Sequence, residues 1–353
     1  MTAPEPVGTP PGLGAALLAW GAGDAAVHPL GAGLINQTFA VADPARGRFV
    51  LQRLHPVFRA EVNEDIDVVT RHLQARGEVT PRLLRTLAGD LWVEAGGGVW
   101  RALSWIDGVG LDRLERPEQA TEAGAALARF HRAVSDLGHE FRSVRAGVHD
   151  TARHLANLRQ ALVTHRQHRC FAAVEPLARV ILAAAEQLPP LPAVTERIVH
   201  GDPKLNNILF THDHTRAICL IDLDTLSRMA LPLELGDALR SWCNPAGEDR
   251  SRAWFSLELF AAGVAGYARG AAGWITAAEW RSIVTATETI YIELAARFCA
   301  DALNESYFGW NPREFPSRSE HNQVRAASQL QAARSLAEQR AAAEAAVAAA
   351  FAG

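Results

Sequence analysis

Residues 198–210 read IVHGDPKLNNILF, and residues 217–225 read AICLIDLDT. Each stretch has the apolar character and the length of a buried strand, yet polar side chains crowd one end of each. The hexapeptide THDHTR, which separates them, is typical of a turn. We therefore predict a β-hairpin in which Phe210 lies near Ala217.

Three oxygen-bearing side chains should meet at the open end of this hairpin. Counting back from the turn places Asn207 beside the stretch that ends in Asp222. Asp202 precedes the first strand, in a loop that contains Gly201 and Pro203. Because the two strands run side by side, we expect Asp202, Asn207 and Asp222 to converge.

This set of side chains has the chemistry of a magnesium–phosphate site. Proteins usually hold Mg²⁺ through one or two carboxylates together with substrate phosphates. The order of the residues also matches the kinase catalytic loop, in which an Asp accepts the hydroxyl proton and a Lys neutralises phosphate. Asp202 and Lys204 would take these two roles, and Asn207 and Asp222 would bind the metal. Each residue alone is more often a turn residue, but the complete spaced set favours kinase chemistry.

The bulk composition predicts a soluble protein with two lobes. A length of 353 residues is too great for one small core, and 48% apolar with 21% charged residues is ordinary globular usage. The net charge of −4 gives no electrostatic case for a nucleic-acid or membrane partner. The sequence shows no signal-peptide pattern, no membrane-length apolar window and no clustered cysteines. We therefore expect a cytoplasmic location.

Secondary-structure patterns change character near residue 103. From about residue 27 to residue 94 the sequence favours strands with Gly-containing turns, interrupted by one amphipathic helix at 61–75. The later part is Ala/Leu-rich and predicted to be largely helical over residues 117–137, 150–187, 229–300 and 322–351. We expect an N-terminal nucleotide-binding lobe of residues 1–103 and a C-terminal catalytic and substrate lobe of residues 104–353.

Several segments resemble the aminoglycoside phosphotransferase/choline kinase superfamily, over about residues 27–340. They read GAGLINQTF, FVLQRLHPVF, HGDPKLNNILF, LIDLDT, ELGDALR and RFCADALNESYF. Within the superfamily the chain is most similar to the N-acetylhexosamine kinase group, which phosphorylates the anomeric hydroxyl of a free sugar. The resemblance implies an α+β, protein-kinase-like bilobal fold, with a small β-sheet lobe that carries one helix and a larger, mainly helical lobe.

The resemblance also implies roles for individual residues. Asp202 looks like the general base, Asn207 and Asp222 like the Mg²⁺ ligands, and Asp237 like a family Asp that braces the catalytic loop. ATP is the implied phosphate donor, with GTP as an alternative, and the acceptor is a small hydroxyl-bearing molecule, above all a sugar. The residues expected at the nucleotide are Gly31 and Gly33 in a phosphate-covering loop, Gln52, Glu64 as the acid that orients a strand Lys, and the hinge residues Ser104, Trp105 and Ile106.

One departure from the superfamily concerns the strand that usually carries a phosphate-binding Lys. This strand reads VLQRL here, so Gln52 stands at the Lys position with Arg53 beside it. Because side chains alternate along a strand, Gln52 and Arg53 point to opposite faces. With Gln52 inward, the phosphates lose a fixed cation and Glu64 loses its usual partner. The N-acetylhexosamine kinase group shows a similar Gln.

The acceptor residues match that group in part. Arg297 and Tyr307 match polar residues that contact sugar in the N-acetylhexosamine kinases. Leu34 replaces a His that is common there. Ser241 stands where an aromatic side chain would pack on a sugar ring, and Trp242 is adjacent.

Other interpretations stay open. A protein kinase is disfavoured, because Leu-Asp rather than Phe-Gly follows Asp222 and no Ala-Pro-Glu or activation segment lies downstream. A nucleotide-binding scaffold without catalysis is supported by the missing strand Lys, whereas the complete set of base and metal residues favours an enzyme. For an enzyme, the alternative acceptors are an aminoglycoside, choline or an amino-alcohol.

Overall fold

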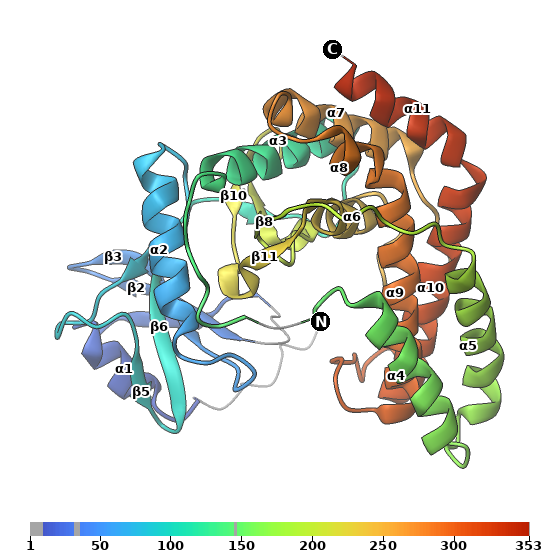
Figure 1. The fold of residues 1–353 in the computed structure, drawn as a ribbon. Coiled ribbons are helices and arrows are strands. Elements are labelled where there is room, and N and C mark those ends of the chain that lie inside the picture. Colours follow the sequence, from blue (N-terminus) through green and yellow to red (C-terminus); the bar gives the residue numbers. More distant parts are fainter. Residues whose placement is uncertain (1–9, 32–35, 145–146, 353) are drawn as a thin grey trace. The chain divides into compact units, whose positions relative to one another are not determined.

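The computed structural model describes residues 10–31, 36–144 and 147–352. The chain forms two compact units, which are best described separately. The first unit extends to Asp107 and also takes in Leu137–Val144. The second comprises Gly108–Asp136 and the chain that follows Val144 (Figure 1).

A six-stranded antiparallel sheet forms the centre of the first unit. Its order is β1–β2–β3–β6–β4, and β5 also pairs with β6. The bounds are β1 Ala26–Pro29, β2 Gln37–Asp43, β3 Gly47–Arg53, β4 Leu83–Leu84, β5 Val93–Ala95 and β6 Gly98–Ser104. The strand-rich N-terminal part predicted from the sequence is confirmed.

One face of this sheet is apolar. Phe39, Leu51 and Trp100 belong to a buried cluster that also includes side chains of α1, Leu13–Ala19. Strand alternation explains the pattern, since every second residue points to this face. The sequence patterns did not predict α1, because a helix of 7 residues gives less than two full turns of periodicity.

The opposite face of the sheet is polar near its centre. Gln52 and Arg101 are direct partners in the register of β3 and β6. Helix α2, Val62–Ala75, approaches this face through Asn63, whose Oδ1 accepts a hydrogen bond from Arg101 Nη1 at 3.4 Å. The helix predicted at 61–75 is confirmed, and its apolar residues at helical spacing, Val62, Ile66, Val69 and Leu73, are buried.

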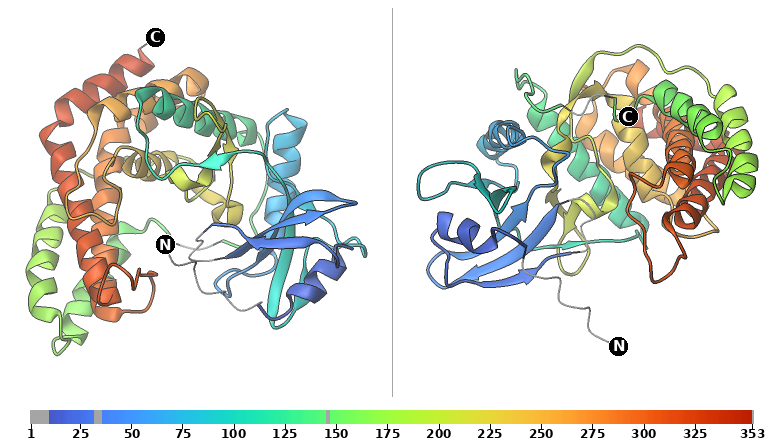
Figure 2. Two further views of the ribbon diagram at one scale, coloured as in Figure 1. Left: turned by 180° about the vertical axis from the view of Figure 1, so that it is seen from behind. Right: turned by 90° about the horizontal axis from the view of Figure 1, so that it is seen from below.

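Helices dominate the second unit, as the sequence predicts. Their bounds are α3 Pro117–Val134, α4 Thr151–Thr164, α5 Phe171–Glu186, α6 Leu231–Trp242, α7 Leu257–Ala271, α8 Ala277–Arg281, α9 Ile283–Asn304, α10 Arg318–Glu338 and α11 Arg340–Phe351. The buried helix α9 packs against α4, α5, α6 and α10 (Figures 1 and 2). The helical span predicted at 150–187 is two helices, because the polar segment HRQHRC interrupts it.

Two short sheets complete the second unit. β7 Val109–Gly110, β9 Ile208–Phe210 and β10 Ala217–Leu220 form one, and β8 Glu196–Val199 pairs with β11 Ser227–Ala230 in the other. Phe210 pairs with Ala217, so the predicted hairpin is confirmed. An irregularity between Ala217 and Cys219 shifts the register by one residue, so that Leu220 pairs with Ile208. The α+β class is confirmed as well. Within the described ranges, no helix is both long and apolar enough to cross a membrane.

Candidate active site

The loop after β8 is held by one buried carboxylate. Glu234, at the start of α6, is fully buried and accepts hydrogen bonds from the backbone N–H groups of His200 at 2.9 Å and Gly201 at 3.0 Å. Buried backbone donors need such partners, since water cannot reach them. Glu234 therefore fixes the start of the loop that carries Asp202.

Further polar contacts support this carboxylate. His131 Nε2 lies 3.4 Å from Glu234 Oε1, and His131 Nδ1 lies 3.0 Å from the Tyr267 hydroxyl. Helices α3 and α7 thus reach the loop through side chains that are fully or almost fully buried. The Asp237 carboxylate, which we expected to brace the loop, accepts hydrogen bonds from Arg240, at 2.8 and 3.1 Å. Short-range sequence patterns contain no signal for the role of Glu234.

His200 ties the loop to the end of the hairpin. Burial lowers the pKa of His200, against the raising effect of the Glu234 carboxylate, so the ring is neutral at pH 7. Its Nε2–H donates to the Ile221 carbonyl at 2.9 Å. The Ile221 N–H in turn donates to the Asn207 carbonyl at 2.8 Å. These bonds hold the segment that ends in Asp222 against the segment that contains Asn207.

Gly201 is required by the same geometry. Its φ of +82° lies in the left-handed region, and a Cβ there would lie 2.2 Å from the Thr225 carbonyl oxygen. Thr225 Oγ1 donates to the His200 carbonyl at 2.9 Å. Any larger residue would force the loop away from η2, Leu223–Thr225, which follows Asp222.

Asp202, Lys204 and Asn207 form one hydrogen-bonded group. Lys204 Nζ donates to Asp202 Oδ2 at 2.6 Å, and Asn207 Nδ2 donates to the same oxygen at 3.1 Å and to the Asp202 carbonyl at 2.8 Å. The Asp202 side chain keeps 28% of its surface exposed and Lys204 keeps 38%, so both remain accessible to a ligand. Asn207 is buried, at 5% exposed.

Asp222 lies at the same end of the hairpin. It is exposed and has a left-handed backbone, with φ 64° and ψ 56°, a conformation that Asp tolerates better than most residues. Burial lowers the pKa of Lys204, but the charges of Asp202, Asp222 and Glu248 outweigh this effect and raise it above the usual value. The Asp222 carboxylate is therefore within electrostatic reach of Lys204, which stays positively charged at neutral pH.

The available donors fit a magnesium ion that arrives with phosphate. Asp202 and Asp222 supply carboxylate oxygens, and Asn207 has an amide oxygen in addition to the nitrogen that faces Asp202. Within the part of the chain that the structure describes, no group of three or more His, Cys, Asp or Glu forms a metal cluster. Mg²⁺ commonly takes only one or two protein carboxylates and completes its shell with phosphate and water.

The predicted nucleotide-binding residues of the first unit are two loop glycines, Gly31 and Gly33, and two polar residues, Gln52 and Glu64. Gly31 is exposed and has φ +72°, whereas Gly33 lies outside the described residues. Gln52 Oε1 accepts hydrogen bonds from Arg101 Nη2 at 2.7 Å and from Arg101 Nε at 2.9 Å. Glu64 forms an ion pair with Arg142. The cationic side chain that contacts Gln52 is thus Arg101 of β6. Its position could not be predicted from the spacing of Gln52 and Glu64 in the sequence.

The predicted hinge segment consists of Ser104, Trp105 and Ile106, and Ser104 forms hydrogen bonds with Arg82. The Ser104 N–H donates to the Arg82 carbonyl at 2.8 Å, and the Arg82 N–H donates to Ser104 Oγ at 2.9 Å. The Ser104 N–H is therefore already used within the first unit. The Arg48 guanidinium lies over the Trp105 ring, at 3.8 Å from its centroid.

The predicted acceptor residues gather around Phe308. The Arg297 guanidinium lies 5.7 Å from the Phe308 ring centroid, and the Tyr307 ring meets the same ring edge-on at 4.8 Å. Arg297 Nη1 also lies 3.9 Å from Glu293 Oε1. Tyr307 is 53% exposed, so it is accessible to a ligand.

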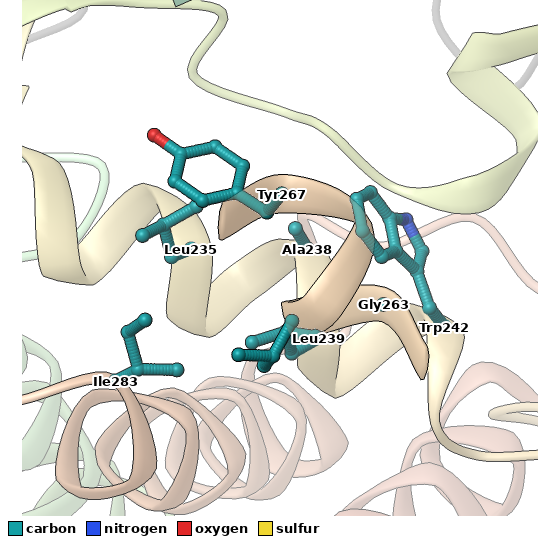
Figure 3. Close-up of a pocket in the computed structure, with 8 residues that line it drawn as sticks. Leu235, Ala238, Leu239, Trp242, Gly263, Tyr267 and Ile283 are labelled. Carbon is teal, nitrogen blue, oxygen red and sulfur yellow. The ribbon is translucent and has the colours of Figure 1, made fainter. Parts of the chain in front are cut away.

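Trp242 is buried and contacts the loop that carries Asp202, so its side chain is not exposed to an acceptor substrate. It is 2% exposed, and its indole N–H donates to the Pro203 carbonyl at 3.0 Å. Ser241 Oγ accepts from the Leu205 N–H at 3.1 Å. Trp242 also lines a small apolar cavity of about 10 Å³ with Leu235, Leu239 and Tyr267, among others (Figure 3). This space is at the lower limit for a single water molecule and is a packing defect of the helical core.

The chain matches the phosphotransferase enzyme family (APH) over residues 26–279, and it belongs to this family. The resemblance to the superfamily is confirmed. The protein is a small-molecule kinase, which transfers phosphate to a hydroxyl acceptor.

Solved structures share the fold at low sequence identity. An aminoglycoside phosphotransferase from Alicyclobacillus acidocaldarius subsp. acidocaldarius has 18% identity and a TM-score of 0.60, with 91% of this chain and 92% of that chain covered. A microcompartment-associated aminopropanol kinase has 15% identity and a TM-score of 0.63, with 94% and 97% covered. An amicoumacin kinase in complex with AMP-PNP and Ca²⁺ has 14% identity and a TM-score of 0.58, with 86% and 87% covered.

Proposed function

We propose that the protein uses ATP to phosphorylate the anomeric hydroxyl of a free N-acetylhexosamine or a related sugar. Nucleotide binding is assigned to residues 1–103, and catalysis and acceptor binding to residues 104–353. One observation carries the catalytic part. Asp202 Oδ2 lies 2.6 Å from Lys204 Nζ and 3.1 Å from Asn207 Nδ2, so one short loop holds a base, a cation and an amide.

Asp202 is the proposed general base. Its carboxylate accepts the proton of the acceptor hydroxyl while the hydroxyl oxygen attacks the γ-phosphorus of ATP. The bond from this phosphorus to the β–γ bridging oxygen breaks, and ADP leaves. Lys204 supplies a fixed positive charge beside the transferring group, because the neighbouring carboxylates keep its pKa above the usual value although the side chain is partly buried.

Asn207 and Asp222 are the proposed holders of Mg²⁺. When bound, the ion neutralises negative charge on phosphate oxygens. The αL backbone of Asp222 directs the chain into η2 directly after β10, so its carboxylate stands at the open end of the hairpin. The use of ATP is supported by the family match and by the AMP-PNP and Ca²⁺ in the structure of the related amicoumacin kinase.

A neutral acceptor is favoured by the charge balance around Arg297. Glu293 is paired with His149, with 3.0 Å between Oε1 and Nδ1, and Asp237 is paired with Arg240 at 2.8 Å. These carboxylates are already neutralised within the protein, so they attract a cationic amine weakly. Among the described residues, His149 Nε2 is one of the buried side-chain nitrogens without a hydrogen-bond partner.

A phosphate-transfer assay with a panel of acceptors tests both parts of this proposal. The panel contains free hexoses, N-acetylhexosamines, aminoglycosides, choline and amino-alcohols, each with MgATP. We expect transfer to the anomeric oxygen of a free sugar. Transfer to an amine-bearing acceptor alone would overturn the sugar assignment and leave the kinase assignment intact.

The Asp202→Asn variant tests the mechanism. We expect its turnover to fall by roughly 10²–10⁴-fold, the usual contribution of a general base, while calorimetry still detects MgATP binding. Asp213→Asn is the matched control, because Asp213 is exposed in the hairpin turn. The control should keep the wild-type turnover. An Asp202→Asn variant with wild-type turnover would remove Asp202 from the mechanism.

A further inference from the structure

The loop between α9 and α10 carries one of the predicted acceptor residues. It comprises residues 305–317 and joins two helices that pack side by side (Figure 1). Loops of this length without secondary structure of their own are uncommon in compact proteins, and many of them are functional. Tyr307, which is 53% exposed, lies near the start of this loop. The position of Tyr307 therefore depends on what fixes the loop.

Asp301, in the last turn of α9, accepts hydrogen bonds from three successive backbone N–H groups of the loop. Its Oδ1 accepts from Ser306 at 3.0 Å and from Tyr307 at 2.9 Å. Its Oδ2 accepts from Phe308 at 2.9 Å. Asp301 is 3% exposed, so water competes little for these bonds, and hydrogen bonds to a carboxylate are stronger than those between neutral groups. One buried side chain thus holds the start of the loop.

Helix α10 supports the same carboxylate and the next part of the loop. The fully buried Asn322 donates from Nδ2 to Asp301 Oδ2 at 2.9 Å. Arg325 Nη1 donates to the Gly309 carbonyl at 2.7 Å. Glu305, directly after α9, has a left-handed backbone with φ 47° and ψ 41°, which turns the chain back toward Asp301. The start of the loop is therefore fixed from both helices.

The fixed backbone brings two aromatic rings close to Arg297. The Tyr307 ring meets the Phe308 ring edge-on, with 4.8 Å between centroids. The Phe308 ring lies 4.4 Å from the Phe298 ring and 5.7 Å from the Arg297 guanidinium. Arg297 and Asp301 are four residues apart, so they lie on the same face of α9. One helix face therefore carries one predicted acceptor residue and the carboxylate that holds the other.

We propose that Asp301 is a positioning residue for the acceptor and acts on it through Tyr307. The inference rests on the proposed function, in which Tyr307 contacts the acceptor. A side chain contributes more to binding when its backbone is ordered in advance, because the ordering then costs nothing at the moment of binding. Tyr307 offers a flat apolar ring and a hydroxyl, which fit an acceptor with both C–H and hydroxyl groups. Asp301 thus strengthens acceptor binding without touching the acceptor.

Asp301→Asn tests this role, because it replaces a carboxylate oxygen by an amide nitrogen that cannot accept a hydrogen bond. We expect the KM for the acceptor that the panel identifies to rise by about 10- to 100-fold, the effect of one lost hydrogen bond to a charged group. The kcat and the KM for MgATP should stay within about twofold of wild type, since the loss concerns acceptor binding alone.

Glu288→Gln is the matched control. It makes the same change from carboxylate to amide on the same helix, about 20 Å from Asp301 along the helix axis. Glu288 forms an ion pair with Arg340 of α11. This variant should keep the wild-type KM for the acceptor. An unchanged acceptor KM in Asp301→Asn would overturn the inference.

A double-mutant cycle with Tyr307→Ala separates positioning from a general structural effect. Because Asp301 acts through Tyr307, adding Asp301→Asn to Tyr307→Ala should raise the acceptor KM by no more than about twofold further. Independent effects, in which the two increases multiply, would overturn the inference.

Amide hydrogen exchange measures the loop directly and needs no acceptor. The amides of residues 306–308 should exchange at least about 10-fold more slowly in wild type than in Asp301→Asn, because their hydrogen bonds protect them. Glu288→Gln should match wild type. Equal exchange in wild type and Asp301→Asn would overturn the inference. Should Asp301→Asn fail to fold, unprotected exchange of these amides in wild type would overturn it instead.

A failure of this inference can be told apart from a failure of the proposed function. If wild type phosphorylates an acceptor other than a sugar, the sugar assignment fails, and the KM of that acceptor tests Asp301. If wild type phosphorylates no acceptor, the proposed function fails, and the exchange rates test Asp301. Active wild type together with an unchanged acceptor KM in Asp301→Asn would fail this inference alone.

Discussion

His149 is a residue whose charge state is set by its surroundings. Burial lowers its pKa, but the hydrogen bond to Glu293 and the charges of Asp237 and Glu293 outweigh both burial and the opposing charge of Arg297. The net effect is a raised pKa. The folded protein therefore binds the His149 proton more tightly than the unfolded chain does.

This difference predicts how stability depends on pH. A group with a raised folded-state pKa contributes its full stabilisation below the unfolded value of about 6.5 and loses it as pH rises through the folded-state value. The stability advantage of wild type over His149→Gln should thus be larger at pH 6 than at pH 8.5. Urea denaturation at both pH values measures it.

The comparison with a variant is necessary because other histidines have the opposite effect. Burial lowers the pKa of His154, His200 and His321, so each of them favours stability at higher pH. The contributions of His200 and His321 cancel between wild type and variant, whereas His154 lies 4.0 Å from the same Glu293 oxygen as His149 and can change with it. His28→Gln serves as the control, since His28 is exposed on β1. A pH-independent difference between wild type and His149→Gln would contradict the prediction.

At the scale of elements, helices α3 and α7 approach closely at a glycine. A Cβ on Gly266 would lie 2.0 Å from the Thr121 carbonyl oxygen, a distance that the backbone can relieve only by moving. The next residue, Tyr267, contacts His131, which contacts Glu234, the α6 carboxylate that holds the loop carrying Asp202. A shift of α7 should therefore reach the loop through this chain of contacts.

Gly266→Ala is expected to destabilise the protein by about 1–3 kcal/mol, the usual cost of overpacking, and to lower turnover. Gly14→Ala is the matched control, because Gly14 also lies in a helix and a Cβ there meets nothing within 4 Å. The control should be neutral or more stable by roughly 0.5–1 kcal/mol, since Ala favours helices over Gly. Urea denaturation measures the change in stability of both variants, and a kinetic assay measures their turnover. A Gly266→Ala protein as stable and active as the control would exclude this coupling.

Local patterns explain which elements could be predicted. The hairpin of β9 and β10 was predictable because two apolar runs flank a polar hexapeptide, and α2 because its apolar residues recur at helical spacing. The hydrogen bonds from the loop to Glu234 could not be predicted in this way, because Glu234 lies 33 residues from Gly201 in the sequence. The Arg101–Gln52 pair spans 49 residues, and only the strand register brings the two together.

For the whole molecule, nucleotide binding should appear as added stability. A ligand that binds only the native state stabilises it by about 2.7 kcal/mol at 100 times its Kd. Because the chain forms two compact units, unfolding in urea is expected to show more than one transition, and the gain is summed over them. AMP-PNP with Mg²⁺ is the suitable ligand, since it is not consumed during the measurement.

Removing the metal should remove most of this gain. With EDTA present, AMP-PNP should stabilise wild type far less, because the phosphate charges then face the carboxylates of Asp202 and Asp222 without a cation between them. Asp222→Asn should respond weakly to Mg²⁺, whereas Asp213→Asn should respond like wild type. Equal stabilisation with and without Mg²⁺ would contradict the metal assignment. Asp222 would then be an exposed carboxylate on a left-handed backbone with φ 64°, a conformation that a glycine adopts more easily.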